Sequence, residues 1–201
     1  MLEALENPEI PCYRLHLADS NKPGGIIKQI ITLAEQREIE IAYHSRQELS
    51  RISRNSKQDQ GVAADLECPN HQLFDDFIVN PPKGNFNLIA LDGITNPQNL
   101  GMIIRSVTAS PCCGILLPQK GTATISPLVI KASAGTLFKS TLIHCDNLEQ
   151  ALPKLKDIGV QCCTLSSHSQ QALSEFQVQA PVVYVLGNET EGVSKAVSSL
   201  C

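Results

Sequence analysis

Residues 87–201 alternate short apolar runs with segments of helical periodicity, and this alternation limits the possible folds more than any other feature. The apolar runs are NLIAL, CGILLP, STLIHC, VQCCTL and VVYVLG, and helical patterns such as NPQNLGMIIRSVTA and NLEQALPKLKDIG lie between them. Alternating strands and helices are typical of a parallel sheet whose two faces are covered by helices. The sequence therefore predicts an α/β fold with a mostly parallel sheet in this part of the chain.

The first part of the chain has a smaller pattern of the same kind. We expect strands at YRLHLA and EIEIAYH, a helix at GGIIKQIITLAEQREI between them, and a short strand around QGVAADL. After this strand the periodicity is lost, and prolines and a glycine accumulate in a way that is typical of a linker. The predicted organisation is a small α/β domain at residues 1–67, a linker at residues 68–86, and a second domain at residues 87–201.

The composition is that of a globular protein. A chain of 201 residues of which 42% are hydrophobic can bury a sizeable core. No apolar run approaches the roughly 20 residues that span a bilayer, and the N-terminus MLEALENPEI is acidic where a signal peptide would be basic. We therefore expect a soluble, cytoplasmic protein that has no membrane partner.

The cysteines and histidines indicate neither a disulfide framework nor a metal site. The eight cysteines include the adjacent pairs Cys112–Cys113 and Cys162–Cys163 inside apolar runs, and no CxxC spacing occurs. We therefore expect reduced and mostly buried thiols. The five histidines are scattered without the spacing of metal ligands, so we predict that the protein holds no metal.

The net charge of -4 argues against a strongly basic surface for nucleic acid, but one segment is locally basic. Residues 44–57, HSRQELSRISRNSK, carry four cationic side chains and a single acidic one, Glu48. The cationic side chains are Arg46, Arg51, Arg54 and Lys57. The segment is either a local RNA-binding patch or a solvated helix face.

Two turns at predicted strand ends are candidates for chemistry, because ligands of open parallel sheets bind at the carboxyl ends of strands. The first turn, DGITNPQNLG, follows NLIAL, and the second, GNETEG, follows VVYVL. In the first turn Asn96 is a good N-cap, and Pro97 suits the first position of a helix. An apolar stripe of that helix should face the sheet. The members of this stripe are Leu100, Ile103, Ile104 and Val107.

Asn99, Gly101 and Arg105 contribute little to a core, although they lie on this otherwise apolar helix. Gly101 costs about 1 kcal/mol relative to alanine, which requires a reason such as the close approach of another backbone or of a ligand. Asn99 lies in the first turn, near free N–H groups and the positive end of the helix dipole. Two interpretations remain: a site for an anionic or hydroxyl-bearing substrate, or a loose first turn followed by an exposed arginine.

The second turn, GNETEG, has the features of a loop that holds a ligand by its backbone. Gly187 and Gly192 allow backbone conformations that other residues rarely adopt, and they leave N–H and C=O groups accessible. The turn is not a phosphate loop, because it lacks the GxGxxG and GK[ST] patterns and its two carboxylates would repel phosphate. A neutral or cationic ligand fits it better.

In this order and at this separation, the two turns resemble motifs 1 and 2 of the SpoU (TrmH) family of RNA ribose 2′-O-methyltransferases, members of the SPOUT class. LDGITNPQNLGMIIRSVTA matches motif 1, VVYVLGNETEGVS matches motif 2, and VIKASAGTLFKSTLI is similar to the segment between them. The region that ends in DQGVAADL is similar to the substrate-binding domain of the family. The resemblance covers almost the whole chain. It implies a SPOUT-type α/β knot domain that follows a small α/β substrate-binding domain of a kind also found in ribosomal proteins.

The resemblance also implies an activity, methyl transfer from S-adenosylmethionine to a ribose 2′-hydroxyl of structured rRNA or tRNA, and it is strongest to the branch that methylates a guanosine of 23S rRNA. Matched by position, the implied catalytic residues are Arg105, Asn99 and Glu189. The implied cofactor-binding residues are Leu186, Gly187, Asn188 and Gly192. The RNA-binding residues would be Arg46, Arg51, Arg54 and Lys57 in the substrate-binding domain.

Two roles for Arg105 remain open. Because arginine is normally protonated at neutral pH, Arg105 is either a proton acceptor that RNA desolvates, or a clamp on the neighbouring phosphate that positions the hydroxyl. Two subunits usually build each site in this family. The resemblance therefore implies a homodimer, in which Arg105 can serve the cofactor of the partner subunit.

The chain departs from the family pattern at its ends. The third motif, of the SLNVS type, is expected after motif 2, whereas the sequence ends at Cys201, and MLEALENP resembles the inside of the family's opening helix. In the family the tail closes the cofactor pocket, so we expect that the C-terminal knot segment is missing and that this form binds cofactor weakly or not at all. The alternative function is a non-catalytic RNA-binding homologue or fragment that has lost the pocket. A generic nucleotide-binding domain would require motif 1 to be a coincidence.

Overall fold

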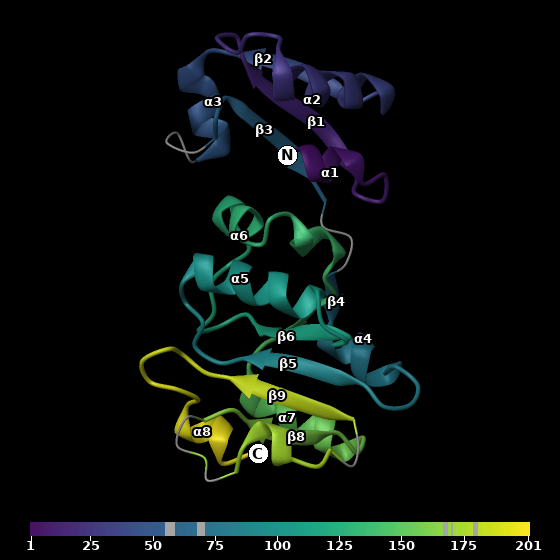
Figure 1. Ribbon diagram of the computed structural model, residues 1–201, viewed down its shortest axis with the longest axis vertical. Coiled ribbons are helices and arrows are strands. Elements are labelled where there is room, and N and C mark those ends of the chain that lie inside the picture. The colour runs from purple at the N-terminus through teal and green to yellow at the C-terminus, as the bar shows by residue number, and fades with distance from the viewer. Residues whose placement is uncertain (55–58, 68–70, 167–168, 170, 179–180) are drawn as a thin grey trace. The chain divides into compact units, whose positions relative to one another are not determined.

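The computed structural model describes residues 1–54, 59–67, 71–166, 169, 171–178 and 181–201. The chain divides into two compact units, residues 1–69 and 70–201 (Figure 1). Each unit has its own sheet and its own hydrophobic core. No helix among the described residues is long and apolar enough to cross a membrane.

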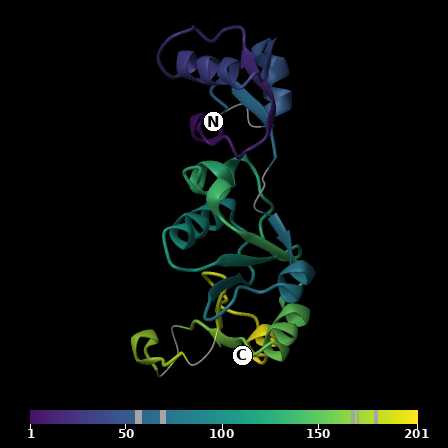
Figure 2. The same cartoon turned by 90° about the vertical axis from the view of Figure 1, so that its right-hand side faces the viewer.

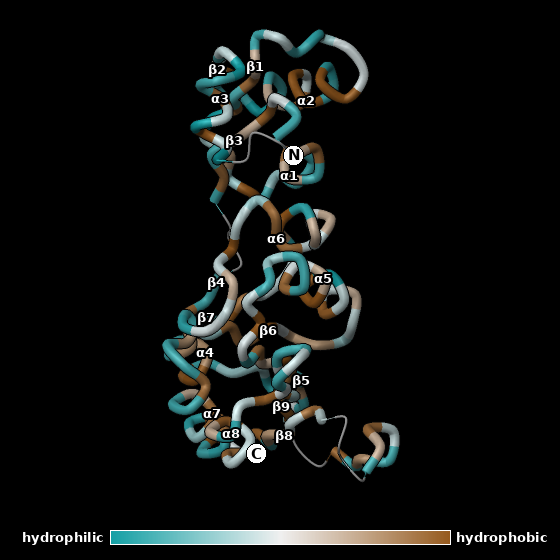
Figure 3. Tube along the Cα trace, turned by 90° about the vertical axis from the view of Figure 1, so that its left-hand side faces the viewer, coloured by the Kyte–Doolittle hydropathy of each residue, from teal (hydrophilic) through white to brown (hydrophobic). Residues whose placement is uncertain are grey.

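The first unit has a three-stranded sheet in the order β2-β1-β3, in which β1 is parallel to β2 and antiparallel to β3. Its elements are α1 (Leu2–Glu6), β1 (Cys12–Ala18), α2 (Gly25–Gln36), β2 (Glu40–His44), α3 (Arg46–Ser53) and β3 (Val62–Leu66). Ile30 and Ala34 of α2 share a core with Leu15 and Leu17 of β1. Hydrophobic and hydrophilic residues alternate along α2 (Figure 3). The three strands and the long helix expected here are confirmed.

The second unit has a six-stranded sheet in the order β4-β7-β6-β5-β9-β8, and every pair of neighbouring strands is parallel. Its strands are β4 (His71–Leu73), β5 (Asn87–Leu91), β6 (Gly114–Pro118), β7 (Leu142–Cys145), β8 (Gln161–Thr164) and β9 (Val182–Leu186). Its helices are α4 (Phe74–Val79), α5 (Pro97–Thr108), α6 (Pro127–Ala132), η1 (Thr136–Lys139), α7 (Leu148–Asp157), η2 (Leu173–Glu175) and α8 (Lys195–Ser198). The α/β class and the parallel sheet are therefore confirmed.

Helices cover both faces of this sheet. α5 and α6 lie on one face, and α4 and α7 lie on the other (Figure 2). On the second face, Phe77 of α4 and Leu152 of α7 pack in one core with Leu88 of β5 and Val183 of β9. β5 lies between β6, the next strand along the chain, and β9, the last strand of the sheet in sequence order, so the strand order reverses at β5. In open parallel sheets, ligands bind at the carboxyl ends of the strands where the strand order reverses in this way.

The segment expected to be a linker, residues 68–86, is folded over part of its length. β4 forms an edge of the six-stranded sheet beside β7, and α4 buries Phe74 and Phe77. The linker prediction is therefore wrong for residues 71–79, while residues 68–70 lie outside the described part. A three-residue strand and a six-residue helix are too short to produce a recognisable periodicity, so the prolines around them dominated the pattern.

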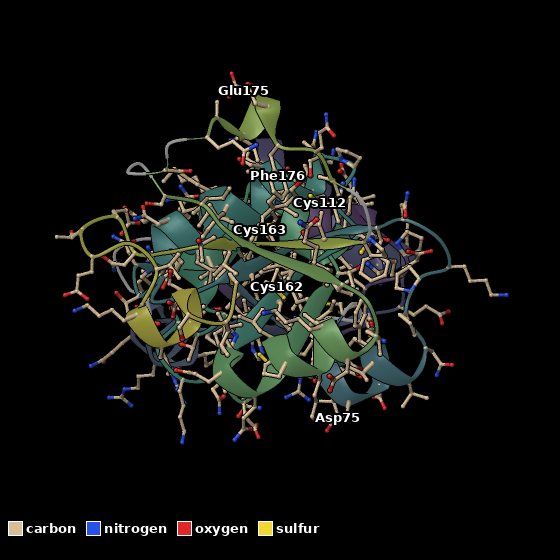
Figure 4. The ribbon with its side chains drawn as sticks, turned by 90° about the horizontal axis from the view of Figure 1, so that it is seen from below. Asp75, Cys112, Cys162, Cys163, Glu175 and Phe176 are labelled. Carbon is tan, nitrogen blue, oxygen red and sulfur yellow. The ribbon has the colours of Figure 1, made fainter. Side chains whose placement is uncertain are left out.

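The cysteines are less buried than the sequence predicts. All seven cysteines in the described part are free thiols, but only Cys145 and Cys162 are buried, and Cys201 is exposed. Cys162 and Cys163 lie on opposite sides of β8 (Figure 4), because successive strand residues point to opposite faces. Cys68 lies outside the described residues. Within the described ranges, no three or more cysteine, histidine or acidic side chains gather in a way that could hold a metal ion.

Candidate functional site

The loops that follow β5 and β9 contact each other at the carboxyl edge of the six-stranded sheet. The backbone N–H of Asp92 donates to the carbonyl of Leu186 at 2.8 Å, and the side-chain amide of Asn188 donates to the carbonyl of Gly93 at 2.9 Å. The loop after β6 joins them through a hydrogen bond from the backbone of Ala123. Three adjacent strands therefore bring their loops together, and both sequence motifs lie at this junction.

Helix α5 begins where the sequence predicts. The side chain of Asn96 accepts hydrogen bonds from the N–H groups of Gln98 and Asn99, and Pro97 is the first helical residue. The predicted apolar stripe faces the core. Leu100, Ile104 and Val107 are buried, and Ile103 is partly buried. The N-cap and this stripe together fix Asn99 in the first turn, beside the loop after β5.

Gly101 has a packing role. A Cβ atom at this position would lie 2.5 Å from Cβ of Ala132, 2.7 Å from the carbonyl oxygen of Val129 and 2.9 Å from the backbone nitrogen of Ser133. These atoms belong to α6 and to its C-terminal cap. Of the two reasons considered for a glycine inside this helix, the close approach of another backbone accounts for it.

Asn99 and Glu189 are brought together although they lie 90 positions apart in the chain. The side-chain amide of Asn99 donates a hydrogen bond to Oε1 of Glu189. Asn99 is partly buried and Glu189 is exposed. An amide donor and a carboxylate acceptor thus meet at the edge of the sheet, and such a pair can orient a hydroxyl group.

Arg105 does not join this pair within one copy of the chain. It is exposed, and no hydrogen bond or ion pair links it to another described residue. Its position six residues after Asn99 corresponds to about 9 Å along the helix axis and about 120° around it. Arg105 shares the side of α5 that carries Gly101, the side that faces α6. The arginine and the Asn99–Glu189 pair therefore lie on different sides of α5.

The GNETEG turn is shaped by Asn188. Its backbone exchanges two hydrogen bonds with Gly192, at 3.0 Å and 2.9 Å. Its side-chain oxygen accepts from the N–H groups of Thr190 at 2.9 Å and Glu191 at 3.3 Å, while its amide group holds Gly93. The resemblance implies that Asn188 binds the cofactor, but its side chain is occupied in building the turn.

Gly187 lies where the turn folds back most closely. A Cβ atom there would lie 2.1 Å from the carbonyl carbon of Gly192 and 2.1 Å from the nitrogen of Val193, so the turn requires glycine. Gly192 has a φ of 72°, in the left-handed region that favours glycine. Among the described residues, neither the N–H nor the C=O of Gly187 has a hydrogen-bond partner. These two backbone groups are therefore available to a ligand.

The charges of the two loops favour a cation over an anion. Asp92, Glu189 and Glu191 supply carboxylates, whereas residues 92–96 and 187–194 contain no lysine, arginine or histidine. A phosphate group would be repelled here, and a positively charged sulfur would be attracted. The free backbone groups of Gly187 lie in the same pair of loops as these carboxylates. This combination of groups fits S-adenosylmethionine.

A further loop, after β8, adjoins the site, and no motif in the sequence points to it. The N–H of Leu165 donates to the carbonyl of Val185 at 3.0 Å, which places the end of β8 beside Leu186 and Gly187. This neighbourhood follows from the order of strands in the sheet. The only sequence signal for it is the end of the apolar run VQCCTL.

The basic residues of the first unit differ in their surroundings. Arg46 forms an ion pair with Asp59, with 3.3 Å between Nη2 and Oδ1, and the Asp59 side chain is only 2% exposed. Arg51 is exposed on α3, and Arg54 is exposed at the C-cap of α3, where its φ is 52°. Lys57 lies outside the described residues. Arg51 and Arg54 are therefore exposed cations, and Arg46, whose side chain is 49% exposed, is also accessible but is paired with Asp59.

The single acidic residue of the basic segment, Glu48, has a structural role. Together with Ser45 it forms a capping box at the start of α3, in which Oε2 of Glu48 accepts from the N–H of Ser45 at 2.9 Å. Hydrogen bonds from the side chain and the backbone of Ser45 hold the pKa of Glu48 below its ordinary value. Glu48 is thus part of the helix start and fixes the direction in which α3 presents Arg51.

Two family models match the chain. The SpoU rRNA Methylase family matches residues 87–201, and the family described as RNA 2'-O ribose methyltransferase substrate binding matches residues 1–72. The first match lies within the second unit, and the second match covers the first unit. The first match thus contains five of the six strands of the second unit, and the second match contains the whole three-stranded sheet.

Similar curated proteins carry the name uncharacterized tRNA/rRNA methyltransferase. The protein of Mycolicibacterium vanbaalenii is 29% identical over 204 residues, and that of Mycobacterium ulcerans is 30% identical over 206 residues. Both alignments cover 97% of this chain and 65% of the relative. The chain thus spans slightly less than two thirds of the length of these relatives.

Solved structures share the fold. The SpoU methyltransferase AviRb from Streptomyces viridochromogenes, in complex with AdoMet, has a TM-score of 0.79 at 21% identity over 99% of this chain and 74% of that one. The AdoMet-bound rRNA methyltransferase from Sinorhizobium meliloti has a TM-score of 0.71 at 23% identity, and the match covers 96% of this chain and 69% of that one. The fold class implied by the sequence motifs is therefore confirmed.

Proposed function

Because the chain belongs to the SpoU rRNA methylase family, we propose that it methylates RNA and transfers the methyl group from S-adenosylmethionine to a ribose 2′-hydroxyl of rRNA or tRNA. The observation that carries the proposal is the hydrogen bond between Asn99 and Glu189, which joins motifs 1 and 2 at the carboxyl edge of the sheet. The names of the curated relatives and the substrate-binding family model support RNA as the substrate.

The cofactor would lie against the GNETEG turn. S-adenosylmethionine supplies a methyl group activated by a positively charged sulfur. Leu186, Gly187 and Gly192 form the backbone that would hold it, and the unpaired N–H and C=O of Gly187 are the available contacts. The carboxylates of Asp92 and Glu189 favour its positive charge. The two AdoMet-bound neighbours of the same fold support this choice.

Asn99 and Glu189 would position the substrate hydroxyl. A ribose hydroxyl is a weak nucleophile until its proton is accepted and its oxygen is correctly oriented. A hydroxyl placed between the two side chains would donate its hydrogen to the Glu189 carboxylate and accept a hydrogen bond from the Asn99 amide. Each side chain then makes with substrate the kind of bond that it now makes with the other.

Arg105 would complete the site of a second subunit. Its position on a different side of α5 from Asn99 supports a homodimer in which each arginine serves the partner's site. There it would either accept the hydroxyl proton or clamp the adjacent phosphate by two parallel hydrogen bonds. Both roles require an exposed guanidinium that no residue of its own chain engages, as is found for Arg105 among the described residues.

Transfer of a tritiated methyl group to total RNA, followed by mapping of the labelled nucleotide, tests the function. We expect label on a ribose 2′-oxygen, and we expect Arg105→Ala to abolish transfer while circular dichroism shows an unchanged fold. The matched control is Lys156→Ala, which removes a cation from α7 on the opposite face of the sheet and should leave transfer unchanged. Label on a base, or wild-type turnover in Arg105→Ala, would contradict the proposal.

Mixing inactive variants tests the shared site. If Arg105 acts across the dimer, Arg105→Ala and Glu189→Gln subunits form one intact site when they are combined. Transfer should therefore reappear on mixing, although each variant alone is inactive. Mixtures that form hybrid dimers by native mass spectrometry yet remain inactive would show that Arg105 serves its own subunit.

A further inference from the structure

Asp92, the residue that follows β5, connects the two ends of the GNETEG turn. Its N–H donates to the carbonyl of Leu186 at 2.8 Å, directly before the turn. Its Oδ2 accepts from the N–H of Ser194 at 2.7 Å, two residues after the end of the turn. The contact with Leu186 spans 94 positions of the chain, the contact with Ser194 spans 102, and the seven residues 187–193 lie between these two partners, so Asp92 bridges segments that no local structure would hold together.

The next residue, Gly93, adds a third connection. Its carbonyl accepts from the side-chain amide of Asn188 at 2.9 Å, and a Cβ atom on Gly93 would lie 3.5 Å from Cβ of Asn188. Two consecutive residues after β5 thus hold both the first and the last part of the turn. Glu189 lies between these points of attachment, where it meets Asn99.

The contact between Asp92 and Ser194 is not needed to start α8. Ser194 is the N-cap of that helix, and its own Oγ accepts from the N–H of Val197 at 3.3 Å. Nor do the strands depend on it, since Leu91, Val183 and Val185 are fully buried. What the carboxylate of Asp92 fixes is the position of the turn relative to β5. A charged acceptor suits this task because its hydrogen bonds are stronger than those of a neutral one.

We propose that Asp92 is a positioning residue of the methyl-transfer site. Through the N–H of Ser194, its carboxylate holds residues 187–194 in the shape that presents Glu189 to Asn99 and the backbone of Gly187 to the cofactor. The inference rests on the proposed function for what the site binds. The part that concerns the shape of the turn stands on the hydrogen bonds alone.

Amide hydrogen exchange on the cofactor-free chain tests the shape of the turn. In Asp92→Ala the amides of residues 188–194 should exchange about tenfold faster, the effect of losing one hydrogen bond to a charged group. Asp92→Asn should retain most of the protection, since its side-chain oxygen still accepts. The control is Asp146→Ala, which removes an exposed carboxylate that follows β7 at the same edge and should leave the turn unchanged.

Isothermal titration with S-adenosylmethionine tests the link to the site. Asp92→Ala should weaken binding about tenfold, Asp92→Asn should bind more tightly than Asp92→Ala because it loses the charge but keeps the hydrogen-bond acceptor, and RNA affinity should be unchanged. Unchanged exchange overturns the proposal, and so does faster exchange with unchanged cofactor affinity, which would be a purely structural role.

If Asp92→Ala unfolds, Ser194→Pro removes the same hydrogen bond, because proline has no N–H. The φ of Ser194 is -58°, which proline can adopt. The exchange rates and the cofactor affinity of this variant then test the proposal in the same way. A wild-type chain that binds no S-adenosylmethionine would favour the non-catalytic RNA-binding alternative over the proposed function, while the exchange measurement still decides whether Asp92 shapes the turn.

Discussion

At the scale of single residues, two opposing effects act at Gly101: glycine lowers the stability of the helix, but it allows α6 to pack closely. Alanine in place of glycine would stabilise an isolated helix by about 1 kcal/mol. In this chain the added Cβ would meet α6 at 2.5–2.9 Å, and overpacking of this kind costs about 1–3 kcal/mol. We expect Gly101→Ala to lower the free energy of unfolding in chemical denaturation. Ser106→Ala, on the exposed side of the same helix, should be nearly neutral, and a stabilised Gly101→Ala would show that α6 moves away at little cost.

The same residue shows where reasoning from sequence stops. A glycine inside a helix is recognisable as unusual, but the atom that requires it belongs to α6, 28 to 32 positions further along the chain, and only packing reveals it. Arg46 is similar, since its ion pair with the buried side chain of Asp59, 13 positions further along the chain, is visible only in the folded unit. Arg51 needed no such information, because a cation on the outer side of a short helix stays exposed.

At the scale of elements, the pairing of β4 with β7 predicts a pH dependence. Nδ1 of His71 and Nε2 of His144 lie 3.0 Å apart, and burial lowers the pKa of both imidazoles. Because each pKa is lower in the folded than in the unfolded chain, the unfolded chain binds protons first as pH falls. The stability of the neutral pair is therefore present above the ordinary pKa of about 6.5 and is lost as pH falls below it.

Chemical denaturation across a pH series measures this effect. The free energy of unfolding should fall between about pH 7 and pH 5, where unperturbed histidines gain their charge. The double variant His71→Gln with His144→Gln should show a shallower fall over the same range. Equal slopes for the variant and the wild type would mean that other groups cause the pH dependence.

Elements were predictable where they are long. α2 and α5 each have 12 residues, enough for an apolar stripe to recur, and the sequence predicts both. β4 and α4 have three and six residues, and the prediction of a linker failed there. The evidence for β4 is its pairing with β7, and the evidence for α4 is the burial of Phe74 and Phe77; both are properties of the folded unit and not of the local pattern.

At the scale of the molecule, the order of strands decides which loops meet. Chain order predicts a parallel sheet but does not place β9 beside β5, and only that pairing brings Glu189 to Asn99. The resemblance to a family linked the two motifs without showing how they touch. Asp92 and its partner Ser194 lie within the two matched segments, but the resemblance assigned neither of them a role.

The division into two units predicts that RNA binding and cofactor binding are separable. The exposed cations Arg51 and Arg54 belong to the first unit, and the turn around Gly187 belongs to the second. We expect the double variant Arg51→Glu with Arg54→Glu to weaken RNA binding about tenfold or more, and to reduce the salt dependence of that binding by about two phosphate contacts. Titration with S-adenosylmethionine should give the wild-type affinity.

A matched charge reversal separates a local contact from the effect of net charge. Lys22→Glu with Lys28→Glu changes the charge of the same unit by the same amount, and both lysines are exposed outside α3, in the loop before α2 and on α2 itself. If Arg51 and Arg54 contact phosphates directly, this control should retain more of the affinity, because a charge that makes no phosphate contact acts only through the screened field. Equal losses in the two double variants would instead assign RNA binding to the overall charge of the unit, and α3 would then be the solvated face that its sequence also allows.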